Sequence, residues 1–347
     1  MSHRLLRSPQ YFTRSTSNSS VKSSTLEIKI DNVVRYNLVK PASPNVQCSF
    51  EWAELARDYL DVELGSSSTP PTIPALDIDL TQKFFDAVNG GGSQIGSDNT
   101  EAHYGFDGYG DFYEGANPFI PNSSAFPALS NYTQDGNSSS GTKAYTIYAG
   151  KDTAIRVPQV NTDGTITYIS SSFNGTSMSV GGETINIIRK ECTKYTRSGY
   201  GYWNSINTSG FVVFFINKYG GIQQEVFNLK SVEKLQAKRE QFNRNIINAN
   251  STYSVNEHTK QNYNINGNQT ITFNSFYVSE EYSKVYQELL LSEKIWVRLR
   301  IPSTGNFQNV PINIKTSELT NKNSLNDRLI QFEFNFDMSF DFINNIR

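Results

Sequence analysis

The clearest pattern in the sequence is a strict alternation of hydrophobic and polar residues over positions 332–342. The hydrophobic positions are Phe332, Phe334, Phe336, Met338, Phe340 and Phe342. A helix would spread these side chains around its whole circumference, whereas a strand places all of them on one face. Burying six large side chains contributes on the order of 10 kcal/mol. The pattern predicts a strand that is central to the fold or to an interface.

The segments before this strand combine further strands with one amphipathic helix. Alternation predicts strands over 271–278, 295–301 and 310–314. Between the first two, Ser279 is a suitable N-cap, and hydrophobic residues then recur at helical spacing. Those residues are Tyr282, Val285, Tyr286, Leu289 and Leu290. They predict a helix over 279–292.

The middle of the chain is also rich in strand signals. The expected strands are 145–148, 165–169, 184–189, 211–217 and 225–229, and the last two flank Lys218-Tyr-Gly-Gly, which predicts a hairpin. Residues 231–248 are compatible with a helix or with a long edge strand. Residues 230–244 carry five basic and two acidic side chains, which favours a solvated or intersubunit face over a nucleic-acid site.

The N-terminal half gives weaker signals. Alternation around Ile28 predicts a first strand, and residues 50–60 predict a short amphipathic helix that Ser49 could cap. A brief helix is expected at 80–88. Residues 89–141 hold many glycines with aromatic residues between them, which indicates a long, partly packed loop.

Together these elements predict a mainly β protein with two β-sandwich-like domains, a few short helices and long polar loops. The length of 347 residues suits two domains, because a domain usually holds about 100–200 residues. We expect a flexible arm at 1–25, an N-terminal β-rich domain at 26–230 with a Gly/Tyr-rich loop insertion around 89–141, and a C-terminal β-rich domain at 231–347.

Composition and charge narrow the classes of function. Charged residues make up only 18% of the chain and the net charge is −2, so no broad positive field attracts nucleic acid. The longest apolar run, Phe211 to Ile216, is far shorter than the ~20 residues that span a bilayer. We expect a protein that is made in the cytoplasm and stays soluble. Cys48 and Cys192 lie in no metal-ligand spacing, and we expect buried, unreactive thiols.

Motifs for catalysis are weak. The three histidines His3, His103 and His258 lie in the expected arm or in Asn- and Gly-rich segments, and neither a nucleophile elbow nor an H-E-x-x-H motif occurs. Gly150-Lys151-Asp152 lacks the other residues of a phosphate-binding loop. We therefore expect no catalytic, cofactor-binding or metal-binding residues, no cofactor, and no enzymatic activity.

One loop offers two specific alternatives. Five carboxylates lie close together in the sequence, and hard oxygen ligands at such spacing could hold Ca²⁺, although solvated loop carboxylates are favoured. They are Asp98, Glu101, Asp107, Asp111 and Glu114. Five aromatic residues lie among them and could stack on sugars, although packing onto the body is favoured. They are Tyr104, Phe106, Tyr109, Phe112 and Tyr113.

Three stretches of the C-terminal half are together similar to segments of known proteins. They are FFINKYGGIQ at 214–223, the helix and strand of 278–297, and SLNDRLIQFEFNFD at 324–337 with the terminal INNIR. Together they resemble segments of virion structural proteins from tailed bacteriophages that infect Bacteroidetes-type hosts. The resemblance covers about a third of the chain and brings no active-site residues with it.

The resemblance implies a structural protein of the tail, neck or baseplate, located in the virion and present in several symmetry-related copies. Its partners would be other virion proteins and copies of itself, with neither nucleic acid nor membrane among them. The alternative is a receptor- or glycan-binding module on a tail appendage or cell surface, with residues 103–113 as its stacking platform. A hydrolase would need carboxylate pairs that the sequence does not place.

Overall fold

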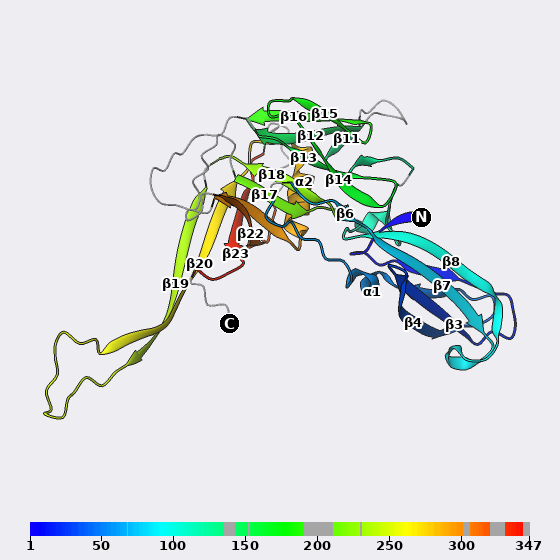
Figure 1. Cartoon of the computed structure of the whole chain (residues 1–347), viewed down its shortest axis with the longest axis horizontal. Coiled ribbons are helices and arrows are strands. Elements are labelled where there is room, and N and C mark those ends of the chain that lie inside the picture. The colour runs from blue at the N-terminus through cyan, green and yellow to red at the C-terminus, as the bar shows by residue number, and fades with distance from the viewer. Residues whose placement is uncertain are drawn as a thin grey trace.

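The computed structural model describes residues 1–67, 69–121, 123–134, 143–151, 153–190, 211–229, 231–300, 306–319 and 330–342. The protein is mainly β, with several sheets and a few short helices, as the sequence predicts. Its shape is an arch (Figure 1): a body of packed sheets, an N-terminal lobe on one side and a long hairpin on the other.

The N-terminal lobe is a sandwich of a large sheet and a small one. Its six-stranded sheet has the order β4 (Val33–Pro41), β3 (Ser23–Ile30), β7 (Leu76–Phe85), β8 (Gln94–Phe106), β1 (Ser2–Leu5), β9 (Phe119–Ile120). The smaller layer consists of β2 (Tyr11–Arg14), β5 (Cys48–Glu51) and helix α1 (Ala53–Arg57). Apolar side chains of β3 and β7 pack against Phe50 and Trp52 between these layers.

The body is built around a seven-stranded sheet. Its order is β18 (Ile222–Phe227), β17 (Phe211–Ile216), β21 (Ile295–Arg300), β22 (Phe307–Ile314), β23 (Glu333–Met338), β20 (Lys260–Asn274), β19 (Val232–Asn243). The 3-10 turn η3 (Glu280–Tyr282) leads into helix α2 (Ser283–Leu291), whose apolar side chains join the core of this sheet.

Two four-stranded sheets complete the body. One has the order β11 (Tyr132–Gln134), β12 (Lys143–Gly150), β16 (Glu183–Lys190), β15 (Ser177–Val180). The other has the order β10 (Phe126–Pro127), β13 (Arg156–Val160), β14 (Thr165–Ser170), β6 (Ile73–Pro74). Apolar residues of β12 and β16 share one core with those of the seven-stranded sheet. This second sandwich confirms the expected fold class.

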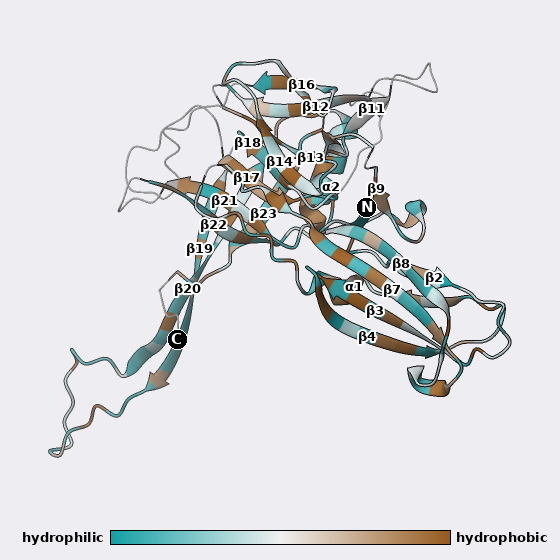
Figure 2. Cartoon of the chain, turned by 45° about the vertical axis from the view of Figure 1, so that its right-hand side comes forward, coloured by the Kyte–Doolittle hydropathy of each residue, from teal (hydrophilic) through white to brown (hydrophobic). Residues whose placement is uncertain are grey.

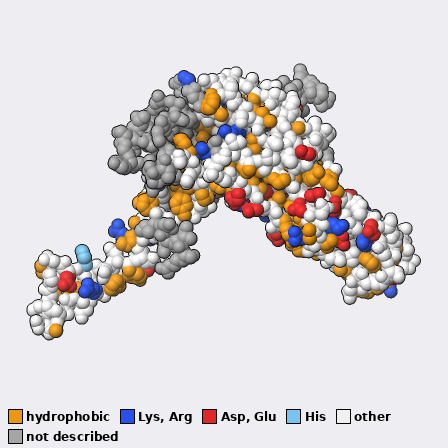
Figure 3. Space-filling view, in the orientation of Figure 1, with side chains coloured by type: hydrophobic (Ala, Val, Ile, Leu, Met, Phe, Trp, Pro, Cys, Tyr) orange, Lys and Arg blue, Asp and Glu red, His pale blue; other side chains and the backbone are white. Residues whose placement is uncertain are grey.

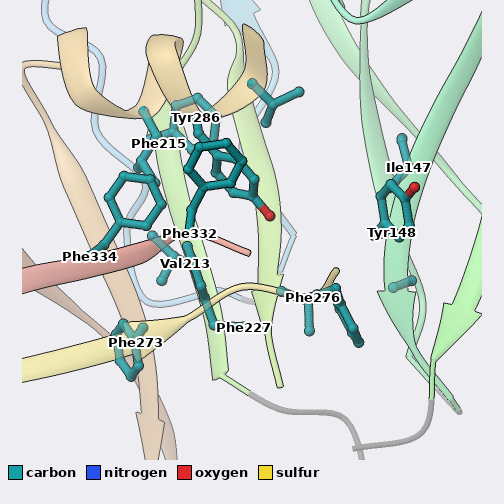
Figure 4. Close-up of a cluster of buried hydrophobic side chains, with 14 of the residues drawn as sticks. Ile147, Tyr148, Val213, Phe215, Phe227, Phe273, Phe276, Tyr286, Phe332 and Phe334 are labelled. Carbon is teal, nitrogen blue, oxygen red and sulfur yellow. The ribbon is translucent and has the colours of Figure 1, made fainter. Parts of the chain in front are cut away.

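The predicted C-terminal strand lies inside the largest core. β23 pairs with β22 on one side and β20 on the other, and Phe334, Phe336 and Met338 are buried on one face. Figure 4 shows Phe332 and Phe334 beside Tyr286 of α2, with Phe273 of β20 nearby. The strand ends at Met338, and the two phenylalanines beyond it, Phe340 and Phe342, are about half exposed. The prediction of a central strand is confirmed, but the strand is shorter than expected.

A separate core connects the lobe to the body. It contains Leu5 and Phe106 from the lobe, Val160 from β13, and Phe214 and Trp296 from the seven-stranded sheet. The turn between β17 and β18 closes the same junction, because the backbone N–H of Tyr109 donates to the carbonyl oxygen of Lys218 at 2.9 Å. A Cβ at Gly108 would lie 2.4 Å from that oxygen, so only glycine allows this approach.

The N-terminal arm expected at 1–25 is integrated into the lobe. β1 lies between β8 and β9, parallel to the first and antiparallel to the second, while β2 pairs with β5. The prediction was wrong because it weighed the Ser- and Thr-rich composition. Leu5, Leu6 and Phe12 are in fact core residues of the chain's own fold.

Two further expectations for the N-terminal half are corrected. The helix expected at 80–88 is the end of strand β7, in which buried and partly exposed residues alternate without a break, followed by the 3-10 turn η1 (Val88–Gly90). The loop expected at 89–141 contains the 13-residue strand β8. β8 lacks an apolar pattern of its own and is extended because it pairs with β7 along most of its length.

The helices are shorter than expected. The first covers only Ala53–Arg57, and the carboxylate of Glu51, not the hydroxyl of Ser49, accepts a hydrogen bond from its first N–H at 2.9 Å. The helix expected at 279–292 begins as η3 and continues as α2 to Leu291. The domain boundary expected at residue 230 does not follow the sheets, because β17 and β18 belong to the seven-stranded sheet of the C-terminal part.

Candidate interaction sites

Of residues 231–248, for which the sequence is compatible with a helix or a strand, Val232–Asn243 form the edge strand β19. It pairs with β20 from Val232↔Thr272 out to Asn243↔Lys260, with a bulge between Lys238 and Glu240. β20 meets its other neighbour, β23, only over Thr270–Asn274. Beyond that point the two strands leave the sheet as a free ribbon, which we call the distal hairpin (residues 238–265; Figure 1).

The distal hairpin exposes an unusual number of large apolar side chains. All its residues except Ile246 are exposed. Phe242 and Tyr263 pack against each other edge to face on one side of the ribbon, with ring centroids 5.8 Å apart. The exposed large apolar residues of the segment are Phe242, Ile247, Tyr253, Val255, Tyr263 and Ile265. Figure 2 shows hydrophobic and hydrophilic stretches interspersed along both strands.

Such a ribbon gains little stability from itself. An isolated two-stranded hairpin is marginal in water, and apolar residues gathered on a protrusion mark a surface that binds something. The base of the ribbon is anchored where the backbone N–H of Phe342 donates to the carbonyl oxygen of Gly267 at 2.8 Å. The amide of Asn266 also donates to Asp341 at 3.0 Å. Further out, the described part of the chain provides no third strand.

Charge on the ribbon is predominantly positive. Residues 238–265 carry four basic side chains and two acidic ones: Lys238, Arg239, Arg244 and Lys260 against Glu240 and Glu257. Glu240 is engaged locally, because a hydrogen bond from the Tyr263 hydroxyl to its carboxylate raises the pKa of Tyr263. The ribbon therefore combines cations with aromatic side chains, which suits a partner that is acidic and partly apolar.

A second exposed feature is the 3-10 turn η2 (Phe112–Glu114). Phe112 is 95% exposed and Tyr113 is 97% exposed, and their rings meet edge to face at 6.0 Å. The turn is rigidly closed, since the N–H of Glu114 donates to the carbonyl of Asp111 and the carboxylate of Glu114 accepts from the N–H of Asp111 at 2.8 Å. We call this feature the aromatic turn.

Lys218 fastens the aromatic turn to the body. Its ammonium group is largely buried and donates to Asp111 and Glu114, at 2.9 Å each. Burial lowers the pKa of Lys218, but the hydrogen bonds to the two carboxylates outweigh it and leave that pKa raised. The Lys218-Tyr-Gly-Gly segment predicted as a hairpin turn thus supports an exposed aromatic pair.

The five carboxylates considered for Ca²⁺ do not converge. The ion pairs of these carboxylates are Asp98 with Lys83, Glu101 with Arg14, Asp107 with Arg57, and both Asp111 and Glu114 with Lys218. Within the described ranges, no group of three or more His, Cys, Asp or Glu side chains could hold a metal ion. The favoured interpretation as solvated loop carboxylates does not describe all five, because the Asp107 side chain is only 14% exposed and each of the five has a cationic partner.

The five loop aromatics divide into two groups. Phe106 is buried, and burial of the Tyr109 hydroxyl raises its pKa strongly, so these residues pack onto the body as expected. Tyr104 is partly buried beside His3, with ring centroids 5.7 Å apart. For Phe112 and Tyr113 the expectation of packing was wrong, and these two remain available for a ligand.

One arrangement in the lobe has the parts of a Ser–His–Glu relay. Ser2 Oγ lies 2.6 Å from His103 Nδ1, and His103 Nε2 lies 3.3 Å from Glu101. The geometry follows from strand register, since Ser2 is paired with His103. The imidazole is stacked flat on Trp52, burial lowers its pKa to about 4, and Arg14 already engages Glu101. These contacts explain the cluster as packing of the N-terminal strand.

Two carboxyls inside the body are fully buried. Glu225 accepts hydrogen bonds from the hydroxyls of Tyr282 at 2.7 Å and Tyr286 at 3.3 Å, yet burial raises its pKa to about 8. Glu288 accepts from the backbone N–H of Lys218 at 3.0 Å, and burial raises its pKa to about 7. Both carboxyls fasten α2 to the β17–β18 hairpin.

Cys48 is buried with a free thiol, as expected, and burial raises its pKa; Cys192 lies outside the described residues. No helix in the described part of the chain is long and apolar enough to cross a membrane. Comparison with protein-family models, with curated proteins and with solved structures gave no match.

The sequence only partly indicated the distal hairpin and the aromatic turn. For the basic stretch 230–244 the sequence favours a solvated or intersubunit face; its described part, residues 231–244, is exposed except for Val232, which agrees with a solvated face. The length of the ribbon was missed because β20 was expected to begin at residue 271, whereas it begins at Lys260. The stretch Gln261–Asn268 is dominated by amide side chains, and its alternation is limited to Tyr263 and Ile265 between asparagines, a weak strand signal.

Proposed function

We propose that this protein is a non-enzymatic structural component of a tailed-phage virion, in the tail, neck or baseplate, where several copies assemble through protein–protein contacts. The observation that carries the proposal is the distal hairpin. A ribbon that projects from a well-packed body and exposes six large apolar side chains suits burial against another subunit. The resemblance of 214–223, 278–297 and 324–337 to virion proteins supports the choice of assembly.

The rest of the molecule fits a mechanical role. The body holds the hairpin's base in a seven-stranded sheet with its own aromatic core, so that a load on the ribbon is passed to a rigid unit. The titratable clusters described above fasten secondary-structure elements together. Their side chains are occupied in packing and hydrogen bonding, which leaves the surface features to carry the function.

The test is incorporation of a shortened variant into particles. Residues 238–265 are replaced by a two-residue Asn-Gly turn, which suits a hairpin end, and the variant is supplied during infection in place of the natural chain. We expect a folded, soluble variant that is absent from purified particles, while a Phe340→Ala control is incorporated. Incorporation of the shortened variant at the natural level would contradict the role of the hairpin, and absence of the natural chain from particles would contradict the virion assignment.

A second candidate function, receptor or glycan binding, is favoured by the aromatic turn. Two adjacent aromatic side chains that are almost fully exposed on a rigid turn can stack on sugar rings. A glycan array probed with the natural chain and with Tyr113→Ala tests it. Binding that is lost in Tyr113→Ala but retained in Phe119→Ala, a nearby exposed control, would favour this function over a purely structural one.

A further inference from the structure

The distal hairpin has a counterpart of opposite charge elsewhere on the same chain. Residues 51–63 carry five acidic side chains and one basic one. They lie at and after α1, next to Glu293 at the end of α2, which pairs with Arg57. We define the acidic face by its exposed members, Glu54, Asp58, Asp61, Glu63 and Glu293. Figure 3 shows acidic side chains gathered where the lobe meets the body.

Four cations lie near this face and do not fully neutralise its five carboxylates: Arg7 and Arg57 pair with Glu293, Arg35 lies over the Tyr59 ring, and Lys294 pairs with Asp61 and Glu63. Lys294 donates to Asp61 at 2.8 Å and to Glu63 at 2.7 Å, but these carboxylates remain 80% and 61% exposed. Neither Glu54 nor Asp58 takes part in an ion pair between described side chains. The face therefore presents a surplus of negative charge to solvent, with the capacity to accept further hydrogen bonds.

Apolar surface accompanies the carboxylates. Tyr59 follows Asp58 directly and is 39% exposed, while Leu291, two residues before Glu293, is 53% exposed. The guanidinium of Arg7 donates to the carbonyl of Leu291 at 2.8 Å and holds this corner in place. A surface with acidic groups around exposed Tyr and Leu side chains has the chemistry that the ribbon's lysines, arginines and aromatic pair require of a partner.

The distal hairpin does not reach the acidic face of its own chain. In both ribbon views the distal hairpin and α1 belong to opposite extensions of the arch, with the body between them (Figures 1 and 2). A contact between the two surfaces therefore joins two molecules. We propose that the distal hairpin of one copy docks on the acidic face of a second copy. This inference rests on the proposed function and names the partner of its central element.

The proposal has a consequence for symmetry. The two surfaces are different, so two copies either exchange hairpins reciprocally about a two-fold axis, or each copy uses its hairpin toward one neighbour and its acidic face toward another, which is a heterologous contact. Repeated heterologous contacts generate a ring when the rotation closes and a helical filament when it does not. Complementary charge would mainly steer the encounter and select the register, while Phe242 and Tyr263 would supply apolar contact area.

The test is a pair of charge reversals in the recombinant full-length chain, with association measured by sedimentation velocity over a range of concentrations. The hairpin variant is Lys238→Glu with Arg239→Glu, and the face variant is Glu54→Lys with Asp58→Lys. All four side chains are exposed or project from the ribbon, so we expect unchanged melting temperatures. Each variant alone should self-associate at least about tenfold more weakly than the natural chain.

Mixing the two variants decides the matter. Their reversed charges match each other, so the mixture should regain association to within about threefold of the natural chain. Zero-length carbodiimide cross-linking of ¹⁴N- and ¹⁵N-labelled natural chains should join Lys238 or Lys260 to Glu54 or Asp58 between differently labelled copies. A mixture that associates no better than either variant, or cross-links confined to single chains, would overturn the proposal.

Failure here is distinguishable from failure of the proposed function. If the reversals leave self-association unchanged while the shortened hairpin is still excluded from particles, the ribbon binds a different virion protein. That result overturns the second copy as partner and leaves the structural role standing.

Discussion

Strand β20 is one continuous element whose inner half is buried and whose outer half is exposed. Its inner half lies between β19 and β23, and Ile271 and Phe273 are buried in the main core. Its outer half, from Lys260 to Ile265, pairs with β19 alone and is exposed along its length. Both halves are extended apart from the bulge at Asn264, whose φ is +48°, so the difference in burial comes from the neighbours. The inner half stabilises the fold, and the outer half is available to a partner.

The largest effect should come from the core end of this comparison. Phe334 is fully buried against Tyr286 and Phe227, so Phe334→Ala should lower the free energy of unfolding by about 3–5 kcal/mol. Phe340→Ala, on the same alternating run but half exposed, should cost less than about 1 kcal/mol. Chemical denaturation measures both, and equal losses would show that the two ends of the run are equally buried.

The buried carboxyl beside that core makes stability depend on pH. Because burial raises the pKa of Glu225 to about 8, the folded state binds a proton that the unfolded state has released. The stabilisation is complete below the ordinary pKa near 4.5 and is lost as pH rises through about 8. Glu288, with its pKa raised to about 7, adds to the same trend. We expect the melting temperature to fall between pH 5 and pH 9.

Glu225→Gln isolates this contribution. The amide keeps partners for Tyr282 and Tyr286 and cannot ionise. The variant should lose less melting temperature than the natural chain over the same pH range. A parallel pH profile in the two proteins would show that Glu225 does not cause the dependence.

A smaller effect is expected where the aromatic turn meets the body. Lys218→Met removes the ammonium group that joins Asp111 to Glu114, and these carboxylates remain partly hydrated. The cost should be about 1 kcal/mol, since exposed partners screen the ion pairs. Lys315→Met, which removes a more exposed pair with Asp337, serves as the control and should cost less. Denaturation curves that rank the two variants in the reverse order would contradict this view of the junction.

The smallest effect on stability should occur on the ribbon. Phe242→Ala and Tyr263→Ala remove an aromatic pair that touches only the hairpin, so each should change the free energy of unfolding by less than about 0.5 kcal/mol. Both should nevertheless weaken assembly, because the same rings would be buried there. A loss of several kcal/mol in the isolated chain would place these residues in a folded core.

The most accurate predictions from the sequence concern elements with a clear hydrophobic periodicity. The run ending at Met338 and the helix that begins after Ser279 were found because one face of each is buried in the same core. The two sandwich-like units followed from these elements, and the fold class is as expected. Pattern is informative where burial on one side selects side chains at every second or every fourth position.

The wrong predictions concern strands whose extended conformation depends on pairing with a neighbouring strand. β8 and β19 have little apolar alternation, and each is extended because it pairs with a neighbour. The sequence itself argues against the helix expected at 80–88, because Leu76, Ile78 and Leu80 alternate with polar residues. The exposure of Phe112 and Tyr113 was not predictable, because the carboxylates of their turn are held by Lys218, about a hundred residues away.

Hydrogen–deuterium exchange along β20 tests the central claim most directly, with the isolated chain and the assembled particle compared. In the isolated chain we predict slow exchange for amides between Ile271 and Asn274 and fast exchange between Lys260 and Ile265, with protection of the second group appearing on assembly. Equal protection of both groups in the isolated chain, or an outer half that exchanges as fast in the particle as in solution, would contradict the account.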